Sequence, residues 1–275
     1  MRGAAVTSLD AVRAVRSAQR EPVLEARNIR VTYRSARGNV TALEDLTATI
    51  GKGEFVSVLG PSGCGKSTLL RLISGLMPPS DGEILLDGRT VAGPRPDVGI
   101  VFQQPTLLPW QSVLENTLLP VRTLKMNVSQ GTAEALQLLR LVGLEKFAQH
   151  YPNELSGGMQ QRVSIARSLV HKPSLLLMDE PFAALDAMTR EHMSKELQRI
   201  WMATNQSVIF ITHSIPEAVF LSDRILVLSA RPGRLVQDLR VDLPRPRTTE
   251  TLGTPEFAAY TNSLRQLFEK LVKFE

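Results

Sequence analysis

The chain contains the stretch Gly60-Pro61-Ser62-Gly63-Cys64-Gly65-Lys66-Ser67-Thr68, which decides its fold. An apolar run at residues 55–59 precedes this stretch, and leucines and an isoleucine at helical spacing follow it at residues 69–73. A glycine-rich loop between a strand and a helix is the context in which a phosphate-binding P-loop occurs. The sequence therefore predicts an α/β fold with a nucleoside triphosphate site at residues 60–68.

The residue types of this loop suit a polyphosphate. Gly60, Gly63 and Gly65 have no Cβ, so the backbone can curl with its N–H groups pointing inward. The positive end of the following helix dipole adds to the attraction for an anion. Lys66 is expected to reach the β- and γ-phosphates of ATP, and the Ser67 hydroxyl is expected to ligate Mg²⁺.

Cys64 is the only cysteine of the chain, which excludes an internal disulfide and is typical of a reducing compartment. Its place at a helix N-terminus beside Lys66 predicts a lowered thiol pKa. Two interpretations follow from the sequence. Cys64 is either a redox-sensitive thiol or a small residue tolerated in a tight loop, and alkylation is expected to block the nucleotide site in either case.

The composition is that of an ordinary globular protein, because 43% of the 275 residues are hydrophobic and 21% are charged. No window approaches the roughly 18 uninterrupted apolar residues of a membrane span, so any pore must belong to another chain. Lysine plus arginine exceeds aspartate plus glutamate by 32 − 27 = 5. This mild excess suits an anionic nucleotide or membrane surface, but it is not the dense basic stripe of nucleic-acid-binding proteins.

Polar residues also follow two other apolar runs. Asp179 and Glu180 end the run that begins at Leu175, and His213 follows the run at residues 207–211. Adjacent carboxylates at the end of a buried strand are costly unless a cation or a reacting group uses them. Asp179 is expected to hold Mg²⁺, whereas Glu180 points to the other face and could polarise a water. Doubly wound folds build their sites at such a shared sheet edge.

A second possible anion site begins at Ser156-Gly157-Gly158, which leads into a helical pattern over residues 163–170. A turn of small residues at the start of a helix presents free backbone N–H groups. This site lies too far along the chain to be assigned to the first nucleotide. A serine-capped helix without a ligand is the alternative interpretation.

The predicted fold class is α/β, with a mainly parallel central sheet, an N-terminal antiparallel β subdomain and a helical subdomain. We predict a flexible extension at residues 1–21, an ATPase domain at residues 22–243, and a linker with a C-terminal helix at residues 244–275. The helical subdomain is expected at about residues 104–170, where the pattern changes from strands to helices. Proline and threonine content suggests that residues 244–254 form the linker.

Together these motifs resemble the ATP-binding subunit of an ATP-binding-cassette (ABC) transporter, over roughly residues 23–243. The resemblance implies that Tyr33 stacks on adenine, although packing is the commoner role of such a tyrosine. It also implies that Gln103 contacts Mg²⁺ or the attacking water and relays the nucleotide state to a membrane partner. Glu180 is then the general base, and His213 orients the γ-phosphate and the water.

The resemblance further implies a head-to-tail dimer, in which the turn at residues 156–158 closes over the γ-phosphate held by a second ATP-binding subunit. The residues do not decide whether that subunit is a second copy of this chain, although a homodimer is the expected form. Transmembrane permease subunits and, indirectly, a solute-binding protein are the other implied partners. The implied location is peripheral, on the cytoplasmic face of the inner membrane.

Two segments, residues 102–110 and residues 229–234, are similar to those of importers in the nitrate, sulfonate and taurine group. Ala184 and Ser214 depart from the serine and aspartate that many relatives carry, but neither removes a catalytic group. A soluble ABC-type ATPase acting on nucleic acid or in translation is the alternative function. A non-hydrolysing regulatory module is disfavoured because Lys66 and Glu180 are both present.

Overall fold

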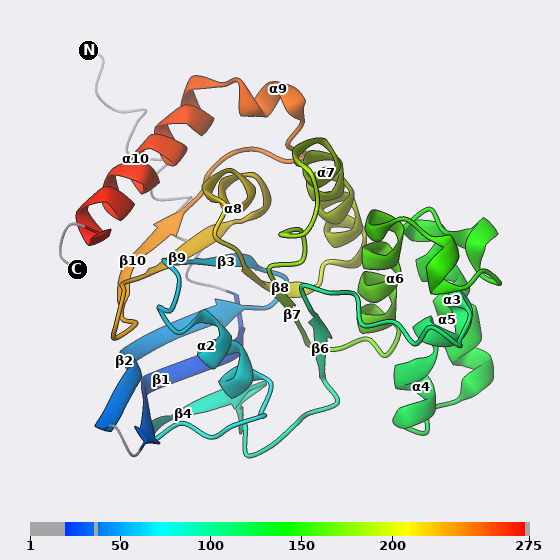
Figure 1. Ribbon diagram of the computed structural model, residues 1–275, viewed down its shortest axis with the longest axis horizontal. Helices are drawn as coiled ribbons and strands as arrows, with labels where there is room; N and C mark the ends of the chain where they lie inside the picture. The colour runs from blue at the N-terminus through cyan, green and yellow to red at the C-terminus, as the bar shows by residue number, and fades with distance from the viewer. Residues whose placement is uncertain (1–19, 36–37, 273–275) are drawn as a thin grey trace, which may run out of the picture.

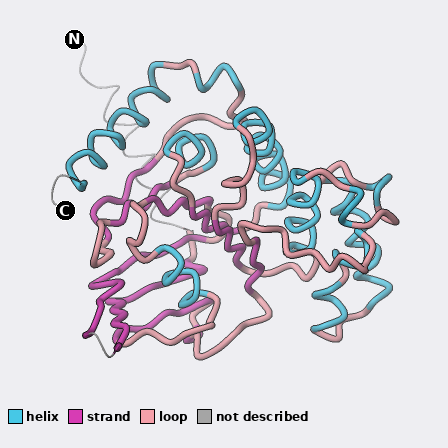
Figure 2. The backbone as a smooth tube through the Cα atoms, viewed as in Figure 1, coloured by secondary structure: helices cyan, strands magenta, loops and turns pink. Residues whose placement is uncertain are grey.

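The structure is a computed structural model that describes residues 20–35 and 38–272, and Figures 1 and 2 show its elements. The extension predicted at residues 1–21 lies outside the described residues, except for its last two. In chain order the elements are β1 (Pro22–Ser35), β2 (Gly38–Gly51), β3 (Phe55–Leu59), α2 (Lys66–Ile73), β4 (Asp81–Leu86), β5 (Arg89–Thr90), β6 (Val98–Val101), α3 (Val113–Thr117), α4 (Leu119–Thr123), α5 (Val128–Leu141), η1 (Glu145–Phe147), η2 (Pro152–Glu154), α6 (Gly157–Leu169), β7 (Leu175–Asp179), α7 (Ala187–Thr204), β8 (Ser207–Ile211), α8 (Ile215–Leu221), β9 (Arg224–Leu228), β10 (Leu235–Arg240), α9 (Thr249–Leu252) and α10 (Pro255–Val272).

Two sheets form the framework. The larger sheet has six strands in the order β10-β9-β3-β8-β7-β6, and its strands are parallel except for β10, which pairs antiparallel with β9. The second sheet has four strands in the order β2-β1-β4-β5 and is antiparallel. A mainly parallel sheet with an N-terminal antiparallel β subdomain is the predicted fold class, which is therefore confirmed.

The parallel strands are apolar throughout because both of their faces are buried. Phe55 and Leu59 of β3 enter a core shared with α6, α7 and α8, whereas Val56 and Val58 enter a core shared with α2 and the antiparallel sheet. Figure 1 shows the same layers, with α2 between the two sheets and α8 on the opposite face of the larger sheet. The P-loop therefore lies on the face of the sheet that the antiparallel subdomain covers.

The helices between β6 and β7 form a separate layer at the edge of the larger sheet. Ser112 begins α3 through a reciprocal capping box with Glu115, and the Asn127 side chain caps α5. Gly143, with a φ of 71°, follows the end of α5, where a left-handed residue is favoured. Helix α6 packs against α3, α5 and β6, so it connects the helical layer to the sheet.

The segment at residues 244–254, whose composition suggested a linker, is exposed or partly exposed except at Arg247, which anchors it to the protein. Arg247 is 2% exposed, and it donates hydrogen bonds to the carbonyl oxygens at the end of α8, those of Val219, Phe220 and Ser222. The last carbonyls of a helix have no partner within the helix, and a cation there also suits the helix dipole. Burial and the nearby Arg245 lower the pKa of Arg247 to about 9, so the guanidinium is charged at neutral pH.

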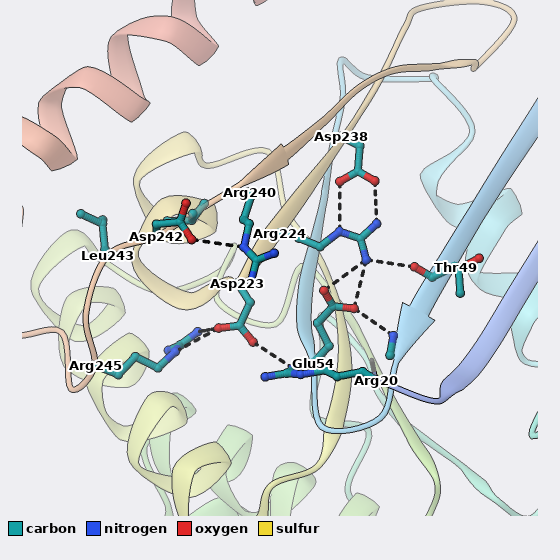
Figure 3. A pocket seen from close by; sticks show the side chains of 12 residues that line it. Arg20, Thr49, Glu54, Asp223, Arg224, Asp238, Arg240, Asp242, Leu243 and Arg245 are labelled. Carbon is teal, nitrogen blue, oxygen red and sulfur yellow. Dashed lines mark hydrogen bonds and ion pairs between the residues drawn. The ribbon is translucent and has the colours of Figure 1, made fainter. Parts of the chain in front are cut away.

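A charged cavity of about 880 Å³ lies at the amino ends of β3 and β9. Figure 3 shows that Arg224 binds Glu54 and Asp238, while Asp223 lies between Arg20 and Arg245. Each charged side chain that lines this cavity has an oppositely charged partner among the described residues. The ion pairs of Asp223 and Arg224 join the start of β9 to β10 and to the C-terminal segment, and a hydrogen bond from Arg224 to the Thr49 carbonyl oxygen joins it to β2.

Helix α10 covers α8, with Phe257 and Leu264 buried on its inner side. Charged residues separate its apolar positions, as expected for a helix with one buried face. None of the helices in the described part of the chain has the length and apolarity needed to cross a membrane.

Replacing Arg247 with methionine should lower the free energy of unfolding by roughly 2–5 kcal/mol, because it leaves buried carbonyl oxygens without a partner. Urea denaturation followed by circular dichroism measures this change. Arg265→Ala is the control, since Arg265 is exposed on α10. Equal stability of the two variants would show that the Arg247 contacts do not hold the C-terminal segment.

Candidate functional site

The P-loop begins where β3 ends and closes where α2 begins, as predicted. The Lys66 ammonium donates hydrogen bonds to the carbonyl oxygens of Gly60 (2.7 Å) and Pro61 (3.0 Å). The lysine is therefore folded across the loop and is mostly buried. Ser62, Gly63 and Ser67 are exposed, so the remainder of the loop is open to a ligand.

Gly65 shows why the loop needs glycine. Its φ is +95°, a conformation that L side chains rarely adopt. A Cβ at this position would lie 2.5 Å from Leu43 Cδ2 and 2.9 Å from the Ala42 carbonyl oxygen. Strand β2 therefore presses against the loop just before α2, and only glycine fits there.

Four neighbouring strands bring the predicted polar residues to one edge of the sheet. The strands β3, β8, β7 and β6 are adjacent and parallel, so their carboxyl ends meet at the same edge. Lys66, His213, Glu180 and Gln103 each follow the end of one of these strands. Such an edge is where open α/β sheets bind their ligands.

The two adjacent carboxylates lie in different settings, because Asp179 is the last residue of β7 and Glu180 follows the strand. Leu175 and Leu177 of this strand enter the α2 core, and strand alternation places Asp179 on the same face as Lys66. Burial, and secondly the neighbouring Glu180, raise the pKa of Asp179, whereas Lys66 opposes this rise. A buried carboxylate without a cation is costly, which suits a role in holding one.

Glu180 turns away from the strand and meets the histidine. Its φ of 44° is left-handed, and its N–H donates to the Ile211 carbonyl oxygen at 2.9 Å. The Glu180 Oε2 atom lies 3.0 Å from His213 Nδ1. The side chains that the sequence proposed as base and orienting group are therefore in direct contact.

A buried carboxylate that the sequence analysis missed supports the His213 turn. Glu217 Oε2 accepts a hydrogen bond from the Thr212 hydroxyl at 2.7 Å, and that hydroxyl oxygen accepts from the Ser214 N–H at 3.0 Å. Burial raises the pKa of Glu217, while Thr212 and then Arg190 oppose the rise. Both residues flanking His213 are thus fixed from within α8.

Arg190 extends this network to the segment after Glu180. Its Nε lies 3.5 Å from Glu217 Oε1, and its Nη2 donates to the Leu185 carbonyl oxygen at 3.0 Å. Leu185 precedes Asp186, which caps α7. The only sequence signal for this link was a glutamate four residues after His213, because the arginine lies far away in the chain.

Gln103 lies exposed on the segment that leaves β6, and α6 holds this segment in place. The Gln161 side chain donates to the Phe102 carbonyl oxygen at 3.2 Å. Arg167 donates to the carbonyl oxygens of Pro105 (2.8 Å) and Thr106 (2.9 Å). Gln103 therefore sits between the sheet edge and the helical subdomain.

Ser156 caps α6, as one of the two interpretations expected, and its Oγ accepts from the Met159 N–H at 3.3 Å. Gly157 is exposed and Gly158 is partly exposed. In the described part of the chain, no hydrogen bond or ion pair joins residues 156–158 to the P-loop. Figure 1 shows α6 beyond β6, whereas α2 lies between the sheets, so one chain does not bring the two motifs together.

Tyr33 stands beside the first turn of α2. Its hydroxyl is 3.1 Å from the Thr68 hydroxyl and 3.5 Å from Met77 Sδ, and 38% of the residue is exposed. An aromatic ring thus borders the P-loop on the side of the antiparallel subdomain. Stacking of this ring on adenine remains a prediction.

The donor atoms along this sheet edge are of the kind that binds Mg²⁺. Ser67, Asp179 and Gln103 offer hydroxyl, carboxylate and amide oxygens, which are hard ligands. Among the residues that the structure describes, no group of three or more His, Cys, Asp and Glu side chains could hold a metal ion. Mg²⁺ does not require such a group, since it usually takes one or two carboxylates together with substrate phosphates.

A family model described as "ABC transporter" matches residues 43–183. An uncharacterized ABC transporter ATP-binding protein of Methanocaldococcus jannaschii is 45% identical over 246 residues, which cover 90% of this chain and 91% of that protein. The chain belongs to the ABC transporter family. The taurine import ATP-binding protein TauB of Burkholderia pseudomallei is 50% identical over 220 residues, or 80% of this chain and 85% of that protein.

Solved ABC structures share the fold. A dimeric ATP-binding cassette bound to ADP and Pi is 34% identical with a TM-score of 0.68, covering 80% of this chain and 100% of that one. The cbiO1 protein from Clostridium perfringens, part of the ABC transporter complex cbiONQ, is 26% identical with a TM-score of 0.72, covering 90% and 98%. The chain is therefore an ABC-type ATPase, and the predicted family, fold and enzyme class are confirmed.

The prediction of a lowered pKa for Cys64 is wrong. The thiol is fully buried, and burial raises its pKa despite the opposing effect of Lys66. The Lys66 ammonium lies 3.8 Å from the sulfur, but it is shared with two carbonyl oxygens of the loop. Desolvation therefore outweighs the helix terminus and the cation at this position.

We expect the Cys64 thiol of the ABC ATPase to react with iodoacetamide at least about 100-fold more slowly in the native protein than in the denatured chain. Burial limits the access of iodoacetamide to the sulfur, and the raised pKa lowers the fraction of Cys64 that is present as thiolate. Because Cys64 is the only cysteine, the modified fraction by mass spectrometry reports this site alone. Rates within tenfold of each other would contradict the buried position.

Proposed function

We propose that this chain is the ATP-hydrolysing subunit of an ABC importer and binds MgATP at residues 60–68. The observation that carries the proposal is the meeting of Lys66, Asp179, Glu180 and His213 at the carboxyl ends of adjacent strands. A cation, a metal-binding carboxylate and a base oriented by histidine are the groups that phosphoryl transfer to water needs. No feature of the described residues favours the alternative role on nucleic acid.

In this proposal the P-loop N–H groups and Lys66 bind the β- and γ-phosphates. Ser67, Asp179 and Gln103 are the residues that would hold Mg²⁺, and the ion, when bound, neutralises charge on the phosphates. Glu180 accepts a proton from the water that attacks the γ-phosphate in line. His213 orients the γ-phosphate and the water, and its 3.0 Å contact with Glu180 also fixes the carboxylate.

We further propose that two copies of the chain form a head-to-tail dimer. The turn at residues 156–158 has no hydrogen bond or ion pair to the P-loop of its own chain, so it is free to bind the nucleotide of a partner. The P-loop is open to solvent at Ser62 and Gly63. The dimeric cassette bound to ADP and Pi supports this arrangement by its similarity. Each ATP then lies between the Lys66 of one chain and the Ser156 of its partner.

The names of the relatives support the importer and the class of solute. The TauB proteins of Burkholderia pseudomallei and Rhizobium johnstonii, both taurine import ATP-binding proteins, are each 50% identical to this chain. We therefore propose that the transported solute is taurine, another sulfonate, nitrate or a similar small nutrient. The chain then acts peripherally on the cytoplasmic face of the inner membrane, together with permease subunits and, indirectly, a solute-binding protein.

The helical subdomain offers a surface for a permease subunit. Trp110 is 70% exposed, and a hollow of about 590 Å³ lies beside it, lined by residues that include Pro109, His150 and Tyr151. Exposed aromatic side chains next to a hollow are typical of the centre of an interface. This surface follows Gln103 in the chain, so a partner bound there could sense the nucleotide through residues 102–106.

Replacing Glu180 with glutamine should lower the ATP hydrolysis rate by about 10²- to 10⁴-fold while ATP binding is kept, because the amide cannot accept the proton of water. Phosphate release measures hydrolysis, and size-exclusion chromatography with ATP is expected to show a stable dimer. The matched control is Lys66→Ala, which should lose ATP binding. Hydrolysis at the native rate in Glu180→Gln would refute Glu180 as the base.

Mixing two inactive variants tests the shared site. Lys66→Ala and Ser156→Arg each damage both sites of a homodimer, but a mixed dimer keeps one site with an intact lysine and an intact serine. An equal mixture should regain about a quarter of the native ATPase activity, if half of the dimers are mixed and the sites act independently. If mixed dimers form, no gain over the separate variants would contradict a head-to-tail dimer with independent sites.

A further inference from the structure

The turn at residues 229–234, between β9 and β10, is closed by its own hydrogen bonds. The Ser229 N–H donates to the Arg234 carbonyl oxygen, and the Arg234 N–H donates back to the Ser229 hydroxyl, both at 2.9 Å. The Ser229 hydroxyl in turn donates to the Pro232 carbonyl oxygen at 2.8 Å. The sequence analysis used this turn only for its resemblance to one group of importers, and the proposed function gives it no role.

Backbone contacts fix this turn against the P-loop. The Gly233 N–H donates to the Ala42 carbonyl oxygen at 2.9 Å, and the Gly233 carbonyl oxygen accepts from the Glu44 N–H at 3.0 Å. A Cβ on Gly233 would lie only 2.0 Å from the Cys64 carbonyl oxygen, so no other residue fits there without moving the backbone. The turn, strand β2 and the P-loop therefore meet through their main chains.

The two arginines of the turn have different surroundings. Arg234 forms an ion pair with Glu44. Arg231 has neither an ion pair nor a hydrogen bond among the described residues, and it lies exposed against the P-loop. A Cβ on Gly63 would be 3.0 Å from Arg231 Nη2 and 3.2 Å from Arg231 Nε, so the guanidinium rests on the tip of the loop.

An unpaired guanidinium at this position suits a polyphosphate. Lys66, the cation that the motif supplies, is folded across the carbonyl oxygens of Gly60 and Pro61, on the inside of the loop. Arg231 meets the same loop at Gly63, beside the exposed Ser62. Its planar fork of N–H donors matches the geometry of phosphate oxygens better than an ammonium does.

We propose that Arg231 is a further nucleotide-binding residue, which contacts the polyphosphate of the nucleoside triphosphate in the P-loop. This inference rests on the proposed nucleotide site at residues 60–68. The turn fixes the backbone of Arg231. Its flexible side chain then extends past Gly63 to the phosphates. Arg231 thereby adds a second positive charge from a segment outside the P-loop motif.

The test compares the dissociation constants of ATP, ADP and AMP for purified variants, measured by isothermal titration calorimetry. Arg231→Ala should weaken ATP binding by roughly tenfold, with a smaller loss for ADP and the smallest for AMP, because the number of phosphates decreases. Arg231→Lys should regain part of the affinity, since it keeps the charge. The matched control is Arg234→Ala, which changes the other arginine of the turn and should leave all three constants unchanged.

Unchanged ATP affinity in Arg231→Ala would overturn the inference, and so would an equal loss for all three nucleotides, which would place Arg231 at the adenosine or α-phosphate that they share and not at the β- and γ-phosphates. Lys66→Ala, measured in parallel, separates this failure from that of the proposed function. If Lys66→Ala loses ATP binding while Arg231→Ala keeps it, only the role of Arg231 is wrong. If neither variant loses ATP binding, the nucleotide site itself is wrong, and the inference falls with it.

Discussion

The parallel register of β3, β8 and β7 is the constraint on which the rest of the site depends. Val58 is paired with Ile211, and Ile211 is paired with Asp179, so the three strands end at the same level. Their interiors are buried on both faces and carry apolar side chains, which leaves the strand ends as the positions for polar groups. Changing this register by one residue would exchange the faces of every side chain on the strand and separate Asp179 from the P-loop.

Two hydrogen-bond networks connect this sheet edge to more distant parts of the chain. Gln161 and Arg167 bind the backbone of residues 102–106, so α6 and the segment that carries Gln103 are held together. On the other side, Glu217 and Arg190 connect the His213 turn to the backbone before α7. Helix α6 or α8 therefore cannot shift without moving a residue at the proposed catalytic edge, unless these hydrogen bonds break.

Most of the framework could be predicted because its signals are local. Continuous apolar runs marked β3, β7 and β8, and helical spacing marked α2 and α6, since burial of a strand or a helix face leaves a pattern within a few neighbouring residues. The motif residues at the strand ends were found in the same way. What could not be predicted are contacts between distant residues, such as Glu217 with Arg190 and Arg247 with the end of α8. An arginine in a proline-rich segment looks like a solvated charge until the fold places helix carbonyls around it. Cys64 was misjudged for a related reason, because its pKa depends on how the fold buries the sulfur.

The ATP-binding residues of one chain lie in two separate parts of the fold. This separation explains how ATP binding can close the proposed dimer. Lys66 and Glu180 lie at the carboxyl edge of the sheet, whereas Ser156 begins α6 of the helical subdomain, and no hydrogen bond or ion pair among the described residues joins them. If a second chain completes each site, ATP bridges two chains only while its γ-phosphate is present, because this group is what both halves bind. Closure then draws on differential affinity for the triphosphate over the diphosphate, and hydrolysis removes that difference. The bonds from α6 to residues 102–106 would carry this closure to the surface around Trp110.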